Sequence, residues 1–260
     1  MELNITSFNV RTKMAEENPQ NEWDNRKDMV MNYINEMSSS IVCMQEIKIS
    51  QSEDLQAGIT ERFGFVYYAR ETKVEAEGLG IAYDKSVWDK LEEEMFWLSE
   101  TPEKMSKGWD GSHFRICLRV LLQHKETGAK LNVFNVHLDV KGEVARYNGM
   151  ALVLDRMKDK NTPSVLCGDF NCKVDTPPYL LAASVLQDCQ AVAPVSDNGT
   201  TCQSWGKVAD DASTAIDFCF VSKKNMQPLT FTICRDKWGE NNERFYSDHY
   251  AVNTTVEMSY

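Results

Sequence analysis

Asp169 and Asn171 belong to the tetrapeptide GDFN (168–171), which directly follows the apolar run 165–167, so the sequence predicts a buried strand with a carboxylate and an amide at its end. Gly168 lets the backbone approach a ligand, and Asp169 can hold or deprotonate a water. Asn171, two residues further on, shares the face of Asp169 and can donate to an anionic oxygen. Asp and Asn also end strands in ordinary turns, so this segment by itself leaves both interpretations open.

Other strand-like segments also carry a polar residue at one end. These residues are Asn9, Glu46, His137 in the run 135–139, Asp217 in the run 215–218, and the pair Asp248 and His249. Catalytic groups concentrate at strand termini and loops of a rigid scaffold, and random surface decoration rarely places a polar residue at nearly every strand end. The pattern therefore favours one catalytic site that is assembled from several strands.

Short apolar runs predict about ten strands. They span Leu3–Val10, Ile41–Glu46, Phe63–Ala69, Leu79–Tyr83, Ile116–Gln123, Leu131–Leu138, Ser164–Phe170, Ile216–Val221, Phe231–Cys234 and His249–Val256. Helical periodicity predicts amphipathic helices over Asp24–Met37 and Glu143–Met157, and a shorter helix over Tyr179–Val185. Because no repeat or linker interrupts this pattern, we expect one α/β domain over residues 1–260, with sheets covered by helices.

The composition is that of a soluble globular protein, because 42% of the residues are hydrophobic and 26% are charged. The first apolar residues alternate with polar ones directly after Met1, so we expect no signal peptide, no membrane span and a cytoplasmic location. Four of the eight cysteines lie in strand-like apolar runs and no pair has CxxC spacing, which predicts buried reduced thiols.

The net charge of −11 disfavours a broad surface that follows a nucleic-acid backbone. A divalent cation and a few local basic residues can still attract one phosphate group. The charge therefore favours a small or short phosphorylated substrate, including a short single-stranded nucleic acid, over long duplex DNA.

Six ordered motifs carry a family resemblance. They are FNVR (8–11), QEI (45–47), NVHLD (135–139), GDFN (168–171), IDF (216–218) and SDHYAV (247–252). In kind and order they resemble the Mg²⁺-dependent endonuclease/exonuclease/phosphatase superfamily, from residue 3 to about residue 256. The resemblance implies the DNase I-like α/β fold, which is a four-layer α/β/β/α sandwich of two mixed, mainly antiparallel sheets with the active site at one end.

Further stretches are similar to a bacterial branch of this superfamily. They are NEWDNR (21–26), FWLSETP (96–102), KGWD (107–110) and RIC (115–117). The chain differs from the abasic-site endonucleases of the superfamily, because Arg11 stands where they carry an acidic residue and His137 where they carry a tyrosine. Both differences point away from DNA repair and toward the deadenylases.

The motifs and the resemblance together imply roles for the strand-end residues. Glu46 is the main candidate ligand of Mg²⁺ or Mn²⁺, since Mg²⁺ binds proteins through one or two carboxylates. Asp169 would orient and deprotonate the attacking water, with Asn171 holding the phosphoryl oxygens. His249 would contact the scissile phosphate, and Asp217 would orient His249 and favour its charged form.

Four further residues complete the candidate site. Asp248 would bind the metal or hold a neighbouring histidine, although it and His249 face opposite ways in a regular strand. Asn9 would brace the carboxylates, and His137 would either hydrogen-bond a phosphate oxygen or fill a strand end. Arg115 either offers a forked donor to phosphate or forms a surface salt bridge.

These roles predict a phosphoesterase that hydrolyses phosphodiester bonds, as nucleases do, by in-line attack of an activated water without a covalent intermediate. A phosphomonoesterase that acts on a sugar or inositol phosphate is the alternative. Counting the basic residues in the pocket separates the two, because a monoester dianion needs more of them. A catalytically silent binding module is the alternative from another class, and the presence of all the candidate residues argues against it.

Overall fold

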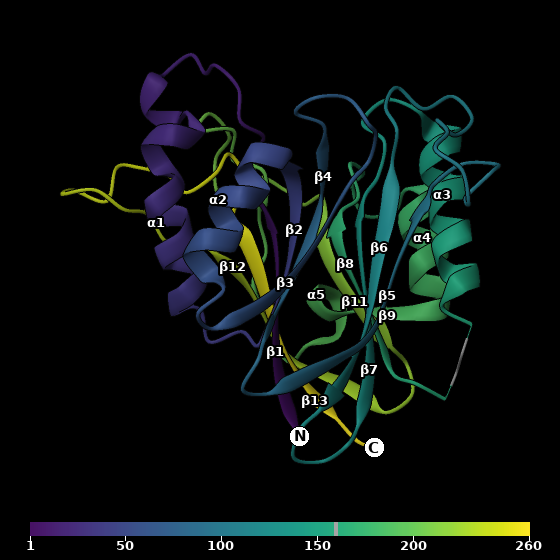
Figure 1. Ribbon diagram of the computed structural model, residues 1–260. Helices are drawn as coiled ribbons and strands as arrows, with labels where there is room; N and C mark the ends of the chain where they lie inside the picture. Colours follow the sequence, from purple (N-terminus) through teal and green to yellow (C-terminus); the bar gives the residue numbers. More distant parts are fainter. Residues whose placement is uncertain (159–160) are drawn as a thin grey trace.

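The computed structural model describes residues 1–158 and 161–260 as two β-sheets stacked face to face, with helices on both outer faces (Figure 1). The strands in these ranges are β1 (Glu2–Asn9), β2 (Ile41–Lys48), β3 (Phe63–Ala69), β4 (Glu77–Asp84), β5 (Trp88–Trp97), β6 (Ile116–His124), β7 (Lys130–His137), β8 (Ser164–Asp169), β9 (Leu186–Asp188), β10 (Val195–Ser196), β11 (Asp217–Ser222), β12 (Met226–Cys234) and β13 (Ala251–Met258). Within the described ranges, one sheet has the seven-strand order β10-β12-β13-β1-β2-β4-β3, and the other has the six-strand order β5-β6-β7-β8-β11-β9.

Helices cover the outer face of each sheet. In the described residues the helices are α1 (Trp23–Glu36), α2 (Ile49–Ile59), α3 (Glu143–Arg156), α4 (Pro177–Val185), the short α5 (Cys189–Val192) and a 3₁₀ turn, η1 (Pro19–Asn21). The short α5 is the exception, because its Cys189 packs in the core between the sheets. Val30 and Leu55, from α1 and α2, pack on the seven-stranded sheet, and Met150 and Ala182, from α3 and α4, pack on the six-stranded sheet. The predicted four-layer α/β/β/α sandwich is confirmed.

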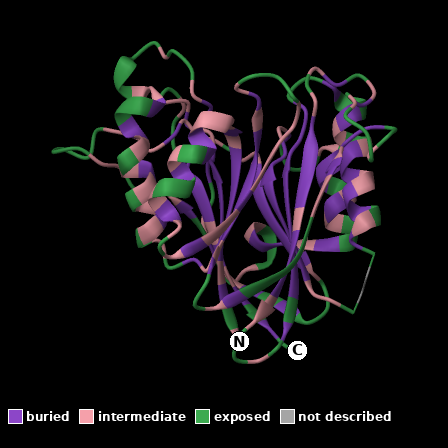
Figure 2. Cartoon of the chain, in the orientation of Figure 1, coloured by how far each residue is buried: buried purple, intermediate pink, exposed green. Residues whose placement is uncertain are grey.

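The central strands are apolar on both faces because each lies between two layers. In β1, Ile5 packs between the two sheets, while Phe8 packs against the helices. Successive side chains of a strand point to opposite faces, so a strand between two layers needs apolar residues at both kinds of position. For this reason the sequences of such strands are nearly continuous apolar runs. Figure 2 shows buried strands throughout the centre, with exposed positions on the outer helix surfaces.

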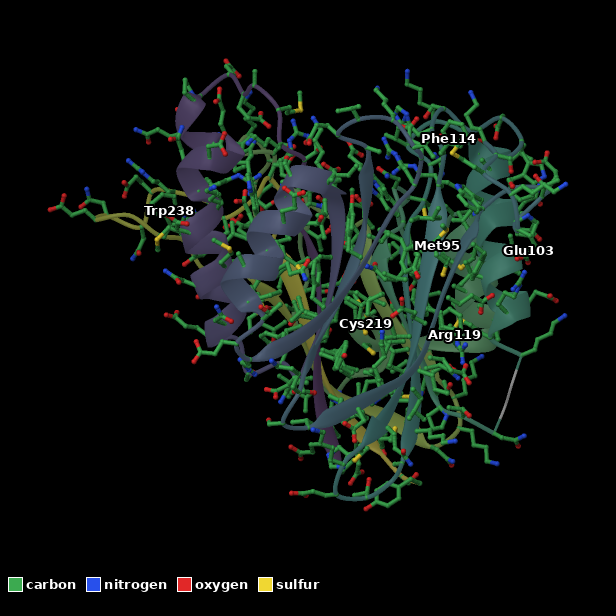
Figure 3. The ribbon with its side chains drawn as sticks, in the orientation of Figure 1. Met95, Glu103, Phe114, Arg119, Cys219 and Trp238 are labelled. Atoms are coloured by element: carbon green, nitrogen blue, oxygen red, sulfur yellow. The ribbon has the colours of Figure 1, made fainter. Side chains whose placement is uncertain are left out.

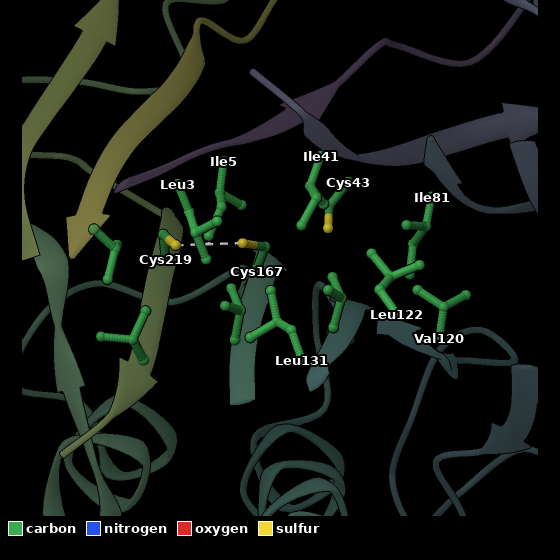
Figure 4. Packing of buried hydrophobic residues seen from close by; sticks show 14 of the residues in the cluster. Leu3, Ile5, Ile41, Cys43, Ile81, Val120, Leu122, Leu131, Cys167 and Cys219 are labelled. Carbon is green, nitrogen blue, oxygen red and sulfur yellow. Dashed lines mark hydrogen bonds between the residues drawn. The ribbon is translucent and has the colours of Figure 1, made fainter. Parts of the chain in front are cut away.

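Cysteines contribute to the core between the sheets. Cys167 and Cys219 are cross-strand neighbours in β8 and β11, with their sulfur atoms 3.4 Å apart (Figure 4). All eight cysteines are free thiols. Burial raises the pKa of the Cys117 thiol well above its ordinary value, which keeps it protonated and unreactive.

Two parallel strand pairs, each joined by a helix, determine where the polar strand ends meet. Strand β1 leads through α1 to β2 and pairs with it in parallel, and β7 leads through α3 to β8 in the same way. Parallel strands present their carboxyl ends at the same edge, and here His137 pairs in register with Asp169. Since β1 starts at the N-terminus, this edge is the end of the sandwich away from both termini (Figure 1).

The structure adds elements that the sequence patterns did not predict. Strand β5 is an edge strand whose mainly charged segment 89–93 is exposed, and its ladder is irregular between Lys90 and Glu92. Charged residues are depleted in strands in general but are tolerated at sheet edges, so this strand was missed. Helix α2 was missed because polar Gln51 and Ser52 occupy buried positions of its inner face.

The bounds of some predicted elements also differ from those of the structure. The first helix spans Trp23–Glu36 instead of Asp24–Met37, and β13 begins at Ala251 rather than at His249. None of the helices in the described part of the chain has the length and apolar character that crossing a membrane requires.

Candidate active site

Asn9, at the end of β1, links carboxylates from the two sheets. Its Nδ2 donates to Glu46 Oε1 and to Asp169 Oδ2, at 3.1 Å in each case. Its Oδ1 accepts from the backbone N–H of Arg11 at 3.0 Å, which fixes the orientation of the amide. A carboxamide nitrogen carries two hydrogens and can serve both carboxylates at once. The buried Asn9 therefore holds a glutamate of one sheet beside an aspartate of the other.

Glu46 reaches this point because β2 bulges. The pairing of β2 with β4 shifts between Met44 and Ile47, and Glu46 has a φ of 62°, which is uncommon for a residue with a side chain. The strand continues to Lys48, whereas the sequence predicted its end at Glu46. Bulges re-aim side chains, and such strained conformations are frequent at functional sites.

The environment of Glu46 favours its charged form. Burial alone would raise its pKa, but the His249 imidazole, the Asn9 amide and the backbone N–H of Thr12 outweigh burial and lower it. The N–H of Thr12 donates to Glu46 Oε2 at 3.0 Å. The carboxylate is therefore ionised and rigidly held, as a metal ligand must be.

Asp169 ends β8 at the centre of the cluster. Its Oδ1 accepts from the backbone N–H of Asn171 at 2.8 Å, and its Oδ2 lies 3.5 Å from His137 Nε2 and 3.9 Å from His249 Nε2. Burial, followed by the neighbouring Asp217 carboxylate, raises the pKa of Asp169 to about 7. A carboxylate with a pKa near neutrality is suited to accept and release a proton.

The two histidines of the cluster have opposite electrostatic character. His249 Nδ1 lies 2.9 Å from Asp217 Oδ2, and this carboxylate overcomes burial and raises the pKa of His249 well above its ordinary value. Burial, followed by Arg115 and Arg70, lowers the pKa of His137 well below its ordinary value. At neutral pH the site therefore presents one charged and one neutral imidazole.

The side chains of Asp248 and Asn171, which were also predicted for the site, contact groups outside the cluster around Asp169. Asp248 Oδ2 lies 3.3 Å from Arg11 Nη1, and residues 247–249 form an irregular segment before β13, so strand alternation does not apply to them. The side-chain amide of Asn171 donates to the carbonyl of Leu138 at 3.0 Å. Asn171 also lies beyond the end of β8, with a φ of 48°, so it does not share a strand face with Asp169.

The carboxylates of the donor set, Glu46 and Asp169, fit a hard divalent cation. Atoms of Glu46, His137 and Asp169 lie within 4.8 Å of one another, and a second such group contains Asp169, Asp217 and His249. Two ligands of one Mg²⁺ lie at most about 4.2 Å apart, because each bond is about 2.1 Å long, so small side-chain shifts close the first group around an ion. Asp248 belongs to neither group.

Arg115 lines a pocket beside this cluster, together with Arg70, which the sequence analysis missed. Glu46, Glu77 and His137 also border this pocket. Arg115 is 6% exposed and lies 3.8 Å from Asp139, so it is not the surface salt bridge that the sequence left open. Arg70 directly follows β3, so the strand-end pattern that identified the other residues was the signal for it.

Buried amides fix the distance between the sheets behind the site. Gln45 Nε2 of β2 donates to Asn135 Oδ1 of β7 at 2.8 Å. Asn135 Nδ2 in turn donates to the carbonyls of Met44 and Gly80, at 2.8 and 2.9 Å. Because buried polar groups are costly unless paired, these bonds lock the relative position of the two sheets and of the residues that they carry.

Gly168→Ala is expected to lower the free energy of unfolding by about 2 kcal/mol or more. Gly168 has a φ of 150°, and a Cβ there would lie 2.0 Å from the carbonyl oxygen of Val136. Urea denaturation measures the change. The matched control is Gly149→Ala in α3, where the new Cβ would lie 3.5 Å from Leu98 and should leave stability equal or higher. Equal midpoints for the two variants would contradict the close approach of β8 to β7.

Comparisons with known proteins agree with this geometry. A model of the endonuclease/exonuclease/phosphatase family matches residues 6–249. The crystal structure of a functionally unknown conserved protein from Enterococcus faecalis is 29% identical, with a TM-score of 0.90 over 99% of this chain and 100% of that one. A mannosyl-6-phosphatase from Bacteroides thetaiotaomicron is 27% identical, with a TM-score of 0.86 over 99% and 100% of the two chains.

A viral relative extends the comparison. An uncharacterised protein of Acanthamoeba polyphaga mimivirus is 30% identical over 158 residues, which are 57% of this chain and 59% of that protein. The aligned part therefore spans less than two thirds of the viral protein.

Because the family model matches nearly the whole chain, and its ordered motifs meet at one end of the sandwich, the chain belongs to the endonuclease/exonuclease/phosphatase family of phosphoester hydrolases.

Proposed function

We propose that the chain hydrolyses phosphate esters by in-line attack of a water on phosphorus, without a covalent enzyme intermediate. The observation that carries the proposal is the position of Asp169. Its Oδ2 lies within 3.9 Å of both His137 Nε2 and His249 Nε2, and its pKa is raised to about 7. A base near neutrality between one neutral and one charged imidazole is suited to activate water beside a phosphoryl group.

Each of these residues has one role in this reaction. Asp169 takes a proton from the attacking water and later returns it to solvent. His249, held by Asp217, donates from Nε2 to a phosphoryl oxygen as charge grows there. As the new P–O bond forms, the bond to the leaving group breaks, and the leaving oxygen takes a proton from solvent. His137 hydrogen-bonds a phosphoryl oxygen without adding charge.

We propose Mg²⁺ as the metal, with Mn²⁺ as a substitute. Glu46 would hold it, with a carboxylate oxygen of Asp169 in the same group. When bound, the cation supplies positive charge against the phosphoryl oxygens. Carboxylate oxygens as ligands support a hard cation of this kind. Asp248 is left out of this ligand set because Arg11 engages its carboxylate.

The kind of ester separates two candidate functions. The sequence favoured a phosphodiester, such as a short single-stranded nucleic acid, with Arg115 as the candidate forked donor to phosphate. Arg70 lines the same pocket as Arg115, so two guanidinium groups are available there. The second guanidinium supports the alternative, a sugar or inositol phosphate monoester. The mannosyl-6-phosphatase among the similar structures adds support for the monoester.

Two observations support further proposals about the protein as a whole. We propose that residues 1–260 form a single domain, because the core between the sheets draws on Leu3 of β1 and on Val256 of β13, at the two ends of the chain. We propose a cytoplasmic location, because the eight cysteines are free thiols, as is usual in reducing compartments.

Turnover of p-nitrophenyl phosphate and bis-p-nitrophenyl phosphate in H₂¹⁸O with Mg²⁺ tests the proposed reaction. Attack on phosphorus places ¹⁸O in the phosphate product and none in p-nitrophenol. The intact-protein mass after an acid quench is expected to show no phosphoryl adduct. Label in the phenol would contradict attack on phosphorus, and a phosphorylated enzyme would contradict direct attack by water.

A further inference from the structure

The pocket beside Asp169 contains guanidinium N–H donors that its own carboxylates do not engage. Arg115 is 6% exposed, and its Nε has no hydrogen-bond partner among the described residues. Its nearest carboxylate, Asp139, is 3.8 Å away, which is too far for a hydrogen bond. A guanidinium presents donors in a planar fork, so a buried Nε without a partner is a donor available to a ligand.

Asp139 does not hydrogen-bond Arg115, because other donors already use its oxygens. They are the backbone N–H groups of Ser112, His113, Lys141 and Gly142, and the hydroxyl of Ser112. Burial alone would raise the pKa of Asp139, but these backbone bonds hold it well below its ordinary value. Asp139 thus serves to fix the loop that carries Arg115, and most of the hydrogen-bonding capacity of the guanidinium remains free.

Arg70 is the second guanidinium of this pocket. It forms an ion pair with Glu77, at 2.8 Å between Nη1 and Oε2, and its buried Nε has no hydrogen-bond partner within the described part of the chain. Burial, followed by the charge of Arg70, lowers the pKa of Arg115, so the two cations repel each other. Each guanidinium therefore keeps a buried N–H donor that can bind an anion from outside.

We infer that Arg70 and Arg115 bind the non-bridging oxygens of a terminal phosphoryl group, so that the substrate is a phosphate monoester. This inference rests on the proposed function. A monoester dianion offers three such oxygens and two charges to the two forks, whereas a diester offers two oxygens and one charge.

Arg70 is the specificity-determining residue in this arrangement. It stands at the start of the β3–β4 hairpin, where its backbone N–H donates to the carbonyl of Glu77 at 2.9 Å. The partner Glu77 holds one edge of the guanidinium and leaves Nε free. Removal of Arg70 is therefore expected to weaken the recognition of the dianion more than that of a singly charged diester, for which one guanidinium suffices.

The test compares kcat/KM for p-nitrophenyl phosphate and for bis-p-nitrophenyl phosphate, with Mg²⁺, in the full chain and its variants. We expect the unchanged protein to prefer the monoester. Arg70→Met is expected to lower kcat/KM for the monoester by roughly tenfold to a hundredfold and to change the diester value by less than about threefold. Arg70→Lys, which keeps the charge but loses the fork, should recover part of the loss.

The matched control is Arg119→Met, on the strand that follows Arg115. Arg119 pairs with Glu92 and hydrogen-bonds Asn132, and Figure 3 shows it well below Phe114, which marks the end of the sandwich where Arg115 lies. Both esters should be hydrolysed by this variant as by the unchanged protein. A second readout is calorimetric binding of inorganic phosphate, which Arg70→Met is expected to weaken by about tenfold or more.

The outcomes separate the inference from the function on which it rests. Preference for the diester, or an equal loss for both esters in Arg70→Met, would overturn the monoester assignment and leave the hydrolase intact. Unchanged phosphate binding in Arg70→Met would also overturn it. Turnover of neither ester would overturn the proposed function and the substrate class together.

Discussion

Asp169→Asn is expected to lower kcat by roughly two to four orders of magnitude, the scale of a lost general base. The amide has nearly the same shape as the carboxylate, but it cannot accept the proton of the attacking water. It also ends the interaction with the charged His249, 3.9 Å away. Steady-state kinetics on the preferred ester measure the effect, and KM should change little because Arg115 and His137 still contact the phosphate.

Asp89→Asn is the matched control for this change. Asp89 is an exposed carboxylate on the edge strand β5, 3.5 Å from Lys125, and its replacement should leave kcat unchanged. Circular dichroism and urea denaturation of both variants check that the fold is retained. Near-normal kcat in a folded Asp169→Asn protein would show that another group activates the water.

Removal of divalent cations with EDTA is expected to abolish hydrolysis, and Mg²⁺ or Mn²⁺ should restore it. Glu46→Gln should raise the Mg²⁺ concentration for half-maximal activity by roughly tenfold or more, because a neutral amide replaces an ionised ligand. The amide also loses the charge that Asn9 and Thr12 stabilise through their hydrogen bonds. Titration of activity against free Mg²⁺ measures this shift.

Glu53→Gln, an exposed position of α2, is the control for the metal titration. Like Glu46→Gln, it replaces one carboxylate by an amide, and it should leave the Mg²⁺ dependence unchanged. Full activity in EDTA would contradict a metal-assisted reaction. A Glu46→Gln protein with the normal Mg²⁺ requirement would move the ligand assignment to other carboxylates of the cluster.

Much of the fold was predictable from the sequence because its signals are local. The continuous apolar run at the start of β2 identifies a strand buried on both faces, and the bounds of β3 agree with the predicted Phe63–Ala69. The family resemblance supplied the stacking of the two sheets. Strand β5 and helix α2 escaped detection because their sequences are more polar than their positions in the fold would suggest.

The candidate residues themselves were also predictable, because catalytic groups concentrate at strand ends and the ordered motifs mark those ends. The pairing of Asp217 with His249 was expected, and their atoms lie 2.9 Å apart. The chemical roles of these residues stay predictions until the variants are measured.

The sequence by itself determined which polar residues stand at the strand ends, since strand periodicity is a property of neighbouring residues. Only the tertiary structure decided which of these side chains meet. The bulge at Glu46 turns its carboxylate toward Asn9, while Arg11 engages Asp248. The presence of Arg70 in the pocket of Arg115 was decided in the same way. The physical reason is that distances between residues far apart in the chain depend on sheet stacking and local backbone irregularities, which no local pattern encodes.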